Sequence, residues 1–304
     1  MPYVDAAGVK LYLEEAGQGY PIIFVHEFGS DLRAWQDQVG HFSRSYRCIT
    51  FNARGYPPSD VPDDAAMYSW EIAIDDIAAV MTGLSIERAH LVGLSMGGYA
   101  ALQFGLRYPE RTSAVVAAGT GSGSMHSQRD VWVRQSRILA RAFGERGMDA
   151  MASQMARHPM RNGLKRKRPE AWQRFVERLS QHSAIGMSHT MARCLALRPS
   201  LHELRDQFAE LTTPVLLAVG EDDESCRAAN QMLHSMLPAA GLWICPKAGH
   251  AINLEEPAPF NLQVEGFLRS VELGGWCRAL PNAELSPTTQ RETAASLLVS
   301  GAQP

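Results

Sequence analysis

A serine lies between two glycines in the stretch Gly-Leu-Ser-Met-Gly at 93–97. An apolar run at 89–92 precedes this stretch, and a run at 98–108 with the apolar spacing of a helix follows it. A sharp turn from strand to helix pushes a serine hydroxyl out of the backbone, and the N-terminus of the following helix favours developing negative charge. The residue types and their order therefore predict that Ser95 is a nucleophile.

A nucleophilic serine needs a base, and later stretches of the chain supply candidates. A strand-like run at 215–219 leads into acidic residues at 221–224, and a second short run at 242–245 is followed closely by His250. Open α/β sheets bind ligands at the carboxyl ends of their strands, where these polar side chains would lie. His250 would accept the proton of Ser95, and a carboxylate would fix the imidazole tautomer and stabilise its cation.

The order serine, acid, histidine resembles the α/β-hydrolase superfamily. The resemblance covers about the first 120 residues and residues 210–270. Its further motifs are Phe-Val-His-Glu-Phe-Gly at 24–29, Phe-Asn-Ala-Arg-Gly-Tyr-Pro-Pro-Ser-Asp at 51–60, Gly-His at 249–250 and Asn-Leu-Glu-Glu-Pro at 253–257. The set is similar to the capped branch that hydrolyses small esters, enol-lactones and carbon–carbon bonds. A serine at the nucleophile position argues against epoxide hydrolases and haloalkane dehalogenases, which use an aspartate there.

The resemblance also implies a role for individual residues. In the family the triad acid is usually the last residue of a G-x-x-D loop, which selects Asp223, with Asp222 as the close alternative and Glu224 as a distant one. An oxyanion hole needs two backbone N–H donors. The family positions of these donors are Met96, after the nucleophile, and Phe28, in the loop after the third strand.

Two residues depart from the family pattern, since Glu27 replaces a glycine and Asn52 replaces an aspartate. We expect the Glu27 side chain to point away from the oxyanion hole and to pair with a base such as Arg54. The alternative is that Glu27 lies in the pocket and tunes the substrate or the attacking water. His26, Glu27 and Asp222 are therefore candidate pocket residues.

Alternating strands and helices must position these groups. Strand-like runs are at 9–14, 22–25, 47–51, 89–94 and 112–118, and helical patterns begin after the good N-caps Asp31 and Ser69. The strand pattern resumes at 214. Such alternation predicts an α/β fold with a mostly parallel sheet and helices on both faces.

The region from 127 to 208 contains helical patterns and no convincing strand pattern. It lies where the family inserts a helical cap, so we predict a core at 1–120 and 211–273 and a cap at 121–210 that covers the Ser95 pocket. Residues 274–304 are rich in Ser, Thr, Pro, Ala and Gln, and we expect a flexible tail.

The composition of the predicted cap supports two competing ideas about the substrate. Seven of the thirteen methionines are at 125, 148, 151, 155, 160, 187 and 191. Ordinary helix packing explains them, yet methionine also suits an adaptable apolar pocket. The basic run at 161–168 is expected to be a solvated loop, and the competing idea is that it attracts an anionic substrate.

Composition excludes several classes of protein. The 304 residues carry a net charge of −3, so we expect no nucleic-acid or membrane partner. The five cysteines are scattered without C-x-x-C spacing, so neither zinc nor a dithiol motif is expected, and the triad chemistry requires neither a metal nor a cofactor. Residues 1–5 lack a basic-then-apolar signal pattern, from which we expect a cytoplasmic protein.

The sequence therefore predicts a serine hydrolase that cleaves a small carboxylic ester or lactone through an acyl-enzyme. A carbon–carbon bond hydrolase of a ring-cleavage product is the alternative, although Leu94 stands where such enzymes typically have Asn. A perhydrolase or haloperoxidase activity and a ligand receptor on the same fold are further alternatives.

Overall fold

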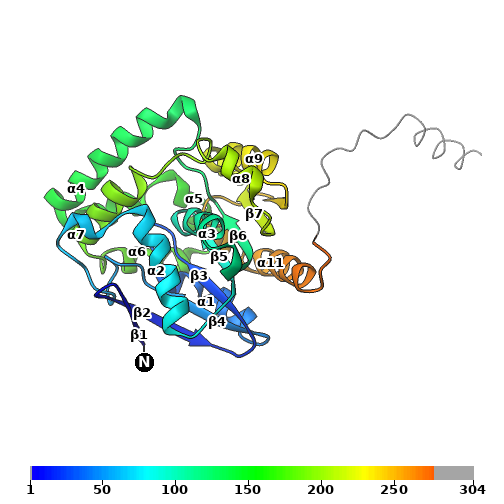
Figure 1. Cartoon of the computed structure of the whole chain (residues 1–304). Helices are drawn as coiled ribbons and strands as arrows, with labels where there is room; N and C mark the ends of the chain where they lie inside the picture. Colours follow the sequence, from blue (N-terminus) through cyan, green and yellow to red (C-terminus); the bar gives the residue numbers. More distant parts are fainter. Residues whose placement is uncertain (1, 277–304) are drawn as a thin grey trace, which may run out of the picture.

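An eight-stranded sheet forms the centre of the computed structural model, which describes residues 2–276 (Figure 1). The strands lie in the order β1-β2-β4-β3-β5-β6-β7-β8. β1 and β2 run antiparallel to their neighbours, and all the other pairs are parallel, which confirms the predicted mostly parallel sheet. The strands are β1 (Tyr3–Ala6), β2 (Val9–Ala16), β3 (Tyr20–Val25), β4 (Tyr46–Phe51), β5 (Ala89–Leu94), β6 (Thr112–Ala118), β7 (Val215–Gly220) and β8 (Ala240–Cys245).

Helices cover both faces of this sheet because alternate strand residues are apolar on each side. On one face, Leu91 and Val115 pack with α2, α3 and α9; on the other, Val92 and Val116 pack with α1 and α11. The helices of these layers are α1 (Gln36–Phe42), α2 (Trp70–Gly83), α3 (Met96–Arg107), α8 (Arg205–Glu210), α9 (Glu224–Met236), α10 (Ile252–Glu255) and α11 (Pro257–Glu272). The two layers bury β5, β6 and β7 completely, whereas β1, β2 and β8 remain partly exposed.

The parallel strands β5, β6, β7 and β8 are neighbours in this order. Their carboxyl ends therefore meet at one edge of the sheet, in keeping with the general position of ligand sites in such folds. Ser95 follows β5, Asp223 lies three residues after β7, and His250 lies in the loop between β8 and α10. The topology thus brings together three residues that are far apart in the sequence.

Between β6 and β7 the described chain contains helices and no strand, and we call residues 121–204 the cap segment. The predicted cap extends to 210, but α8 packs on the core cluster through Phe208. The elements of the cap segment are α4 (Arg129–Ala156), which is interrupted at Gly147, α5 (Asn162–Lys167), α6 (Pro169–Leu179), α7 (Ala184–His189) and a π-helical stretch (Thr190–Leu195). Figure 1 shows α4, α6 and α7 grouped on the left, apart from α8, α9 and α11 on the right. Buried methionines at 148, 151 and 187 contribute to the apolar cluster between these helices.

The described chain ends just after α11. The predicted flexible tail begins at 274, but Trp276 is docked: its ring contacts Phe267, and its Nε1–H donates to the carbonyl of Ala239 at 2.9 Å. The rest of the predicted tail, 277–304, lies outside the described residues.

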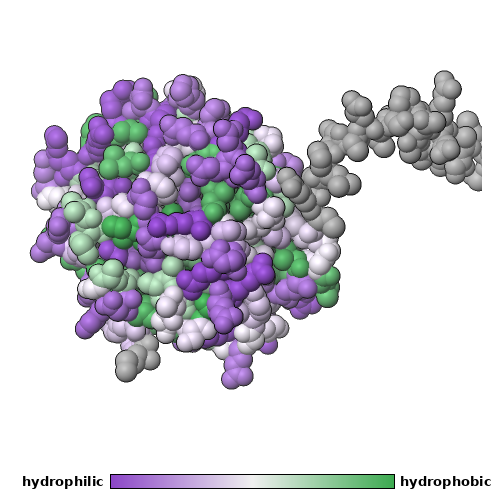
Figure 2. Space-filling view, viewed as in Figure 1, coloured by the Kyte–Doolittle hydropathy of each residue, from purple (hydrophilic) through white to green (hydrophobic). Residues whose placement is uncertain are grey.

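The face drawn in Figure 2 is largely hydrophilic, with apolar side chains in small separate groups. None of the helices within residues 2–276 combines the length and the apolar character that crossing a bilayer requires.

Candidate active site

Ser95 occupies a strained turn between β5 and α3. Its backbone has φ 54° and ψ −107°, a conformation that costs a non-glycine residue on the order of 1–3 kcal/mol. The glycines on either side make the turn possible. A side-chain carbon at Gly97 would lie 2.0 Å from the carbonyl oxygen of Val25, and one at Gly93 would lie 2.2 Å from that of Gly97. Ser95 is half-buried at the strand-to-helix turn where the sequence places it, and its role as nucleophile remains a prediction.

Two backbone N–H groups near the turn are available to a ligand. Met96 is the first residue of α3, so its N–H has no partner within the helix. The N–H of Phe28 has no hydrogen-bond acceptor in the described part of the chain. These are the donors expected of an oxyanion hole, and that role remains a prediction.

His26 holds the loop that carries Phe28. Its Nδ1 bonds the carbonyl oxygen of Glu27 at 2.8 Å, and its Nε2 accepts a hydrogen bond from the Ala53 N–H at 3.1 Å. Burial lowers the pKa of this imidazole, which keeps it neutral. With both ring nitrogens bound to backbone, His26 positions the loop and does not offer a free nitrogen to the pocket.

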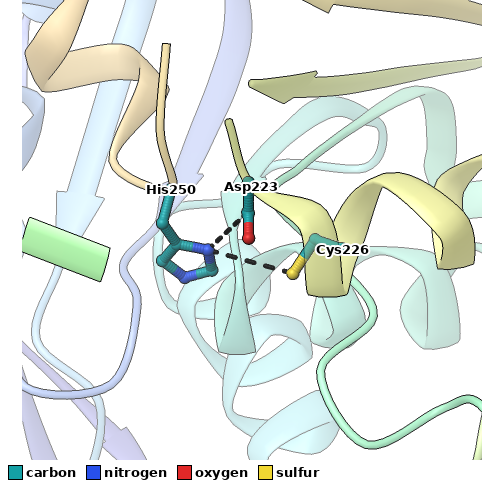
Figure 3. Close-up of side chains that lie close together, drawn as sticks. All are labelled: Asp223, Cys226 and His250. Carbon is teal, nitrogen blue, oxygen red and sulfur yellow. Dashed lines mark hydrogen bonds and ion pairs between the residues drawn. The ribbon is translucent and has the colours of Figure 1, made fainter. Parts of the chain in front are cut away.

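Asp223 and His250 form a buried pair, shown in Figure 3. The Oδ2 atom of Asp223 lies 2.7 Å from Nδ1 of His250, and both side chains are 3% exposed. Asp222 is exposed instead, and its backbone N–H donates to the carbonyl of Ala248 at 2.9 Å. The geometry therefore favours Asp223 over Asp222 as the partner of His250, a choice that the sequence left open.

The charges of this pair stabilise each other. Burial acts to lower the pKa of His250, but the hydrogen bond and charge of Asp223, with help from Cys226, outweigh it and raise that pKa well above 6.5. Burial likewise acts to raise the pKa of Asp223, yet its hydrogen bonds with His250 and Ser225 bring it below 3.8. Asp223 is therefore ionised at neutral pH and favours the imidazolium that forms when His250 takes a proton.

Cys226 is the third polar side chain in Figure 3. Its Sγ lies 3.9 Å from Nδ1 of His250 and 3.4 Å from Oγ of Ser122. Asp223, Cys226 and His250 are the residues within 2–276 whose donor atoms cluster tightly enough for a metal ion. However, the 2.7 Å between Oδ2 and Nδ1 is a hydrogen-bond distance, whereas two ligands of a tetrahedral zinc ion with bonds of ~2.0 Å lie ~3.3 Å apart. The cluster therefore fits a hydrogen-bonded pair better than a metal site.

Glu27 points toward His250, not away from the site. Its carboxylate accepts two hydrogen bonds from the Arg161 guanidinium, at 2.7 and 2.8 Å, and its Oε2 lies 3.7 Å from Nε2 of His250. The expectation that Glu27 pairs with Arg54 is wrong. Arg54 instead donates to both carboxylate oxygens of Asp76, at 2.7 and 2.6 Å, so its guanidinium already has a partner on α2.

The basic run at 161–168 is also not a solvated loop. It folds into α5 and the turns on either side, and three of its cations bind carboxylates of the core. Arg161 binds Glu27, Lys167 binds Glu256 at 2.5 Å, and Arg168 binds Asp37 at 2.5 Å. Arg161 could not be recognised as a site residue from the sequence, because no local pattern distinguishes it from its basic neighbours.

The turn at Ser95 and the imidazole of His250 flank the same residue, Gly119, at the end of β6. A side-chain carbon at Gly119 would lie 3.4 Å from Cδ1 of Leu94 and 3.5 Å from Cε1 of His250. Within residues 2–276 no hydrogen bond joins the Ser95 hydroxyl to His250. Such bonds are often long in free enzymes and tighten when substrate binds, so the geometry is compatible with a nucleophile and its base.

Comparisons with known proteins give similarities that extend over most of the chain. A sequence model of the alpha/beta hydrolase family matches residues 22–263. The chain is 29% identical over 252 residues to a Bacillus subtilis (strain 168) protein that carries the name 2-succinyl-6-hydroxy-2,4-cyclohexadiene-1-carboxylate synthase, covering 82% of this chain and 90% of that one. It is 27% identical to 3-oxoadipate enol-lactonase 2 of Acinetobacter baylyi (strain ATCC 33305 / BD413 / ADP1), over 82% of this chain and 88% of that one.

A solved structure with a similar fold is that of an N-acyl homoserine lactone degrading enzyme. It superposes with a TM-score of 0.72 at 28% sequence identity, and the match covers 88% of this chain and all of that one. The similarity therefore extends over the sheet, both helical layers and the region between β6 and β7.

Proposed function

Because this chain belongs to the alpha/beta hydrolase family, we propose that it is a serine hydrolase that cleaves a small carboxylic ester or lactone. The observation that carries the proposal is the buried Asp223–His250 hydrogen bond at the sheet edge where Ser95 occupies its strained turn. A serine nucleophile, a histidine base and an orienting carboxylate are the groups that acyl transfer needs.

In the proposed reaction, the Ser95 hydroxyl attacks the substrate carbonyl while Nε2 of His250 accepts its proton. Asp223 holds Nδ1 of His250 protonated and stabilises the imidazolium. The N–H groups of Met96 and Phe28 donate to the oxyanion of the tetrahedral intermediate. His250 then protonates the leaving alcohol, and water, deprotonated by the same imidazole, hydrolyses the acyl-enzyme.

The names of two similar proteins support a small ester or lactone as the substrate class, whereas another relative is named 2-hydroxy-6-oxo-6-phenylhexa-2,4-dienoate hydrolase. One relative is named an enol-lactonase, and one structural neighbour is titled a lactone degrading enzyme. A further relative is named a synthase, so membership of the family does not by itself establish ester hydrolysis. The scheme needs neither a cofactor nor a metal, because every proton transfer in it has a side chain of this chain as donor or acceptor.

The test is hydrolysis of p-nitrophenyl esters from acetate to decanoate by the wild-type protein and by Ser95→Ala. The proposal predicts turnover that Ser95→Ala abolishes, together with labelling by a fluorophosphonate that the same change prevents. A folded protein that shows neither turnover nor labelling would contradict it. Assays with a lactone and with a ring-cleavage dienone would then decide between the lactonase and carbon–carbon hydrolase alternatives.

A further inference from the structure

An ion pair is buried beside the reacting nitrogen of His250. The side chains of Glu27 and Arg161 are 2% and 9% exposed, and the two groups meet through parallel hydrogen bonds of 2.7 and 2.8 Å. Oε2 of Glu27 lies 3.7 Å from Nε2 of His250, the atom that serves the nucleophile. The pair is therefore close to the place where a substrate carbonyl must bind.

The guanidinium of Arg161 has little freedom to serve a second anion. Each of its terminal nitrogens donates a hydrogen bond to Glu27, and its Cζ lies 4.4 Å from the ring centre of Phe175. A guanidinium and a carboxylate joined by two parallel hydrogen bonds form a strong contact with a specific geometry. A carboxylate on a substrate would have to displace Glu27 in order to use the same two N–H groups.

The surroundings of the pair are apolar and acidic. The ring of Phe28 packs against Phe143 at 5.8 Å, and both belong to the cluster that contains the cap methionines. A second buried carboxylate, Glu255, accepts a hydrogen bond from the Gly249 N–H at 2.8 Å, next to His250. Beside His250, an additional negative charge from a substrate would face these two carboxylates, and Arg161 is already paired with Glu27. Arg198, which has no carboxylate partner among residues 2–276, instead lines the cavity next to Met96 and Tyr99.

We infer that Glu27 is the built-in counter-ion of Arg161, and that this pairing disfavours a negative charge on the part of the acyl group that lies beside His250. The inference rests on the proposed ester hydrolysis and specifies its substrate class. The sequence left two ideas open, an apolar pocket and a basic run that attracts an anionic substrate. The inference favours the first, because the basic run supplies Arg161 to the site but Glu27 neutralises its charge. Specificity of this kind comes from unfavourable pairing with the wrong ligand as much as from attraction to the right one.

Three esters of equal reactivity and similar length test the inference. They are mono-p-nitrophenyl adipate, which is anionic, methyl p-nitrophenyl adipate, which is neutral, and p-nitrophenyl 6-aminohexanoate, which is cationic. The readout is the ratio of kcat/KM for each charged ester to that for the neutral ester. General damage to the catalytic groups cancels in this ratio, because the same bond is cleaved in all three compounds.

We expect the wild-type protein to prefer the neutral ester. Glu27→Gln should raise the anionic-to-neutral ratio about tenfold or more, the effect of one unit charge several ångströms away at an effective dielectric constant of ~20. Arg161→Gln should instead raise the cationic-to-neutral ratio, because it leaves Glu27 unpaired. The double variant should return both ratios to within about threefold of the wild type, since it removes both charges.

Asp37→Asn is the matched control. It also removes a carboxylate from an ion pair with the cap segment, but the pair that it forms with Arg168 is about a third exposed, so both ratios should stay unchanged. The inference would be overturned if Glu27→Gln and Arg161→Gln changed the three rates in parallel. That result is expected if the ion pair only holds the cap segment on the core. A wild-type preference for the anionic ester would overturn it as well.

The failure of the inference and that of the proposed function are distinguishable. If no ester is hydrolysed in a Ser95-dependent way, the proposed function is wrong. Calorimetric binding of dimethyl adipate and monomethyl adipate to the wild type and to Glu27→Gln then still measures the preference for charge. Tighter binding of the monoanion to Glu27→Gln than to the wild type supports the inference, and equal binding contradicts it.

Discussion

Asp223→Asn is the substitution that tests the geometry of the site most directly. The change keeps the size of the side chain but replaces the acceptor that lies 2.7 Å from Nδ1 of His250. An amide cannot stabilise the imidazolium by its charge, and it favours the tautomer in which Nδ1 is unprotonated. In that tautomer Nε2 carries the proton and cannot accept another from Ser95.

The size of the effect follows from two contributions. A buried hydrogen bond to a charged group contributes about 1.5–3 kcal/mol net, and at about 1.36 kcal/mol per tenfold change this alone lowers kcat by about 10- to 150-fold. Burial of both side chains, each 3% exposed, means that solvent does not screen the loss. The wrong tautomer adds to it, and the same change in a serine protease triad costs about 10⁴-fold. We therefore expect a loss of between 10²- and 10⁴-fold in kcat, about 3–5 kcal/mol.

The assay is p-nitrophenyl butyrate hydrolysis at a pH well above the pKa of His250, with urea unfolding to show that each variant is folded. Asp222→Asn is the matched control, because it removes the same charge from the adjacent exposed residue. We expect the control to stay within about twofold of the wild type, as surface substitutions usually do. An Asp223→Asn variant with near wild-type activity, or a larger loss in Asp222→Asn, would refute the assigned role of Asp223.

Three further predictions follow from the same site. The pKa of His250 is raised and the imidazole must be neutral to act as a base, so kcat/KM should fall as the pH is lowered through a midpoint above 6.5; a pH profile with its midpoint at or below 6.5 would contradict this. Gly97→Ala should destabilise the protein by about 1–3 kcal/mol or more in urea unfolding, because its Cβ would lie 2.0 Å from the Val25 oxygen. Gly105→Ala in the same helix, whose Cβ would lie an ordinary 3.4 Å from its nearest neighbour, should be neutral or stabilising, and equal losses in both variants would count against the steric argument. Dialysis against EDTA should leave ester hydrolysis unchanged, because the Asp223–His250 distance is that of a hydrogen bond; loss of activity that zinc restores would show that the cluster binds a metal.

The elements that carry local signals could be predicted from the sequence. The apolar strand, the small residues around Ser95 and the helix that follows it form one continuous pattern, and the structure has β5, the strained turn and α3 in those positions. The strands before Asp223 and His250 are also visible as local apolar runs. The alternation of strands and helices was enough to predict the parallel sheet. β1 was missed because four residues are too few for an alternating pattern to stand out, although Val4 and Ala6 are buried in the core.

The polar contacts of the site could not be predicted, because each joins residues that are distant in the sequence. Glu27 and Arg161 are separated by 134 residues, and nothing near either residue identifies its partner. Eight residues that include five Lys or Arg side chains look like a solvated segment when they are read alone. Only the tertiary structure shows that core carboxylates neutralise three of these cations.

The pairing of Glu27 with Arg161 has a consequence for how this protein can be altered or recombined. Removing one partner leaves a buried charge without its counterpart, which typically costs about 3–5 kcal/mol, whereas changing both together avoids that penalty. A chimaera that joins this cap segment to the core of a relative with glycine at the position of Glu27 would contain Arg161 without its carboxylate partner. Residues 27 and 161 should therefore be taken from the same parent protein. In a library that exchanges caps between cores, we expect most folded members to have both residues from one parent.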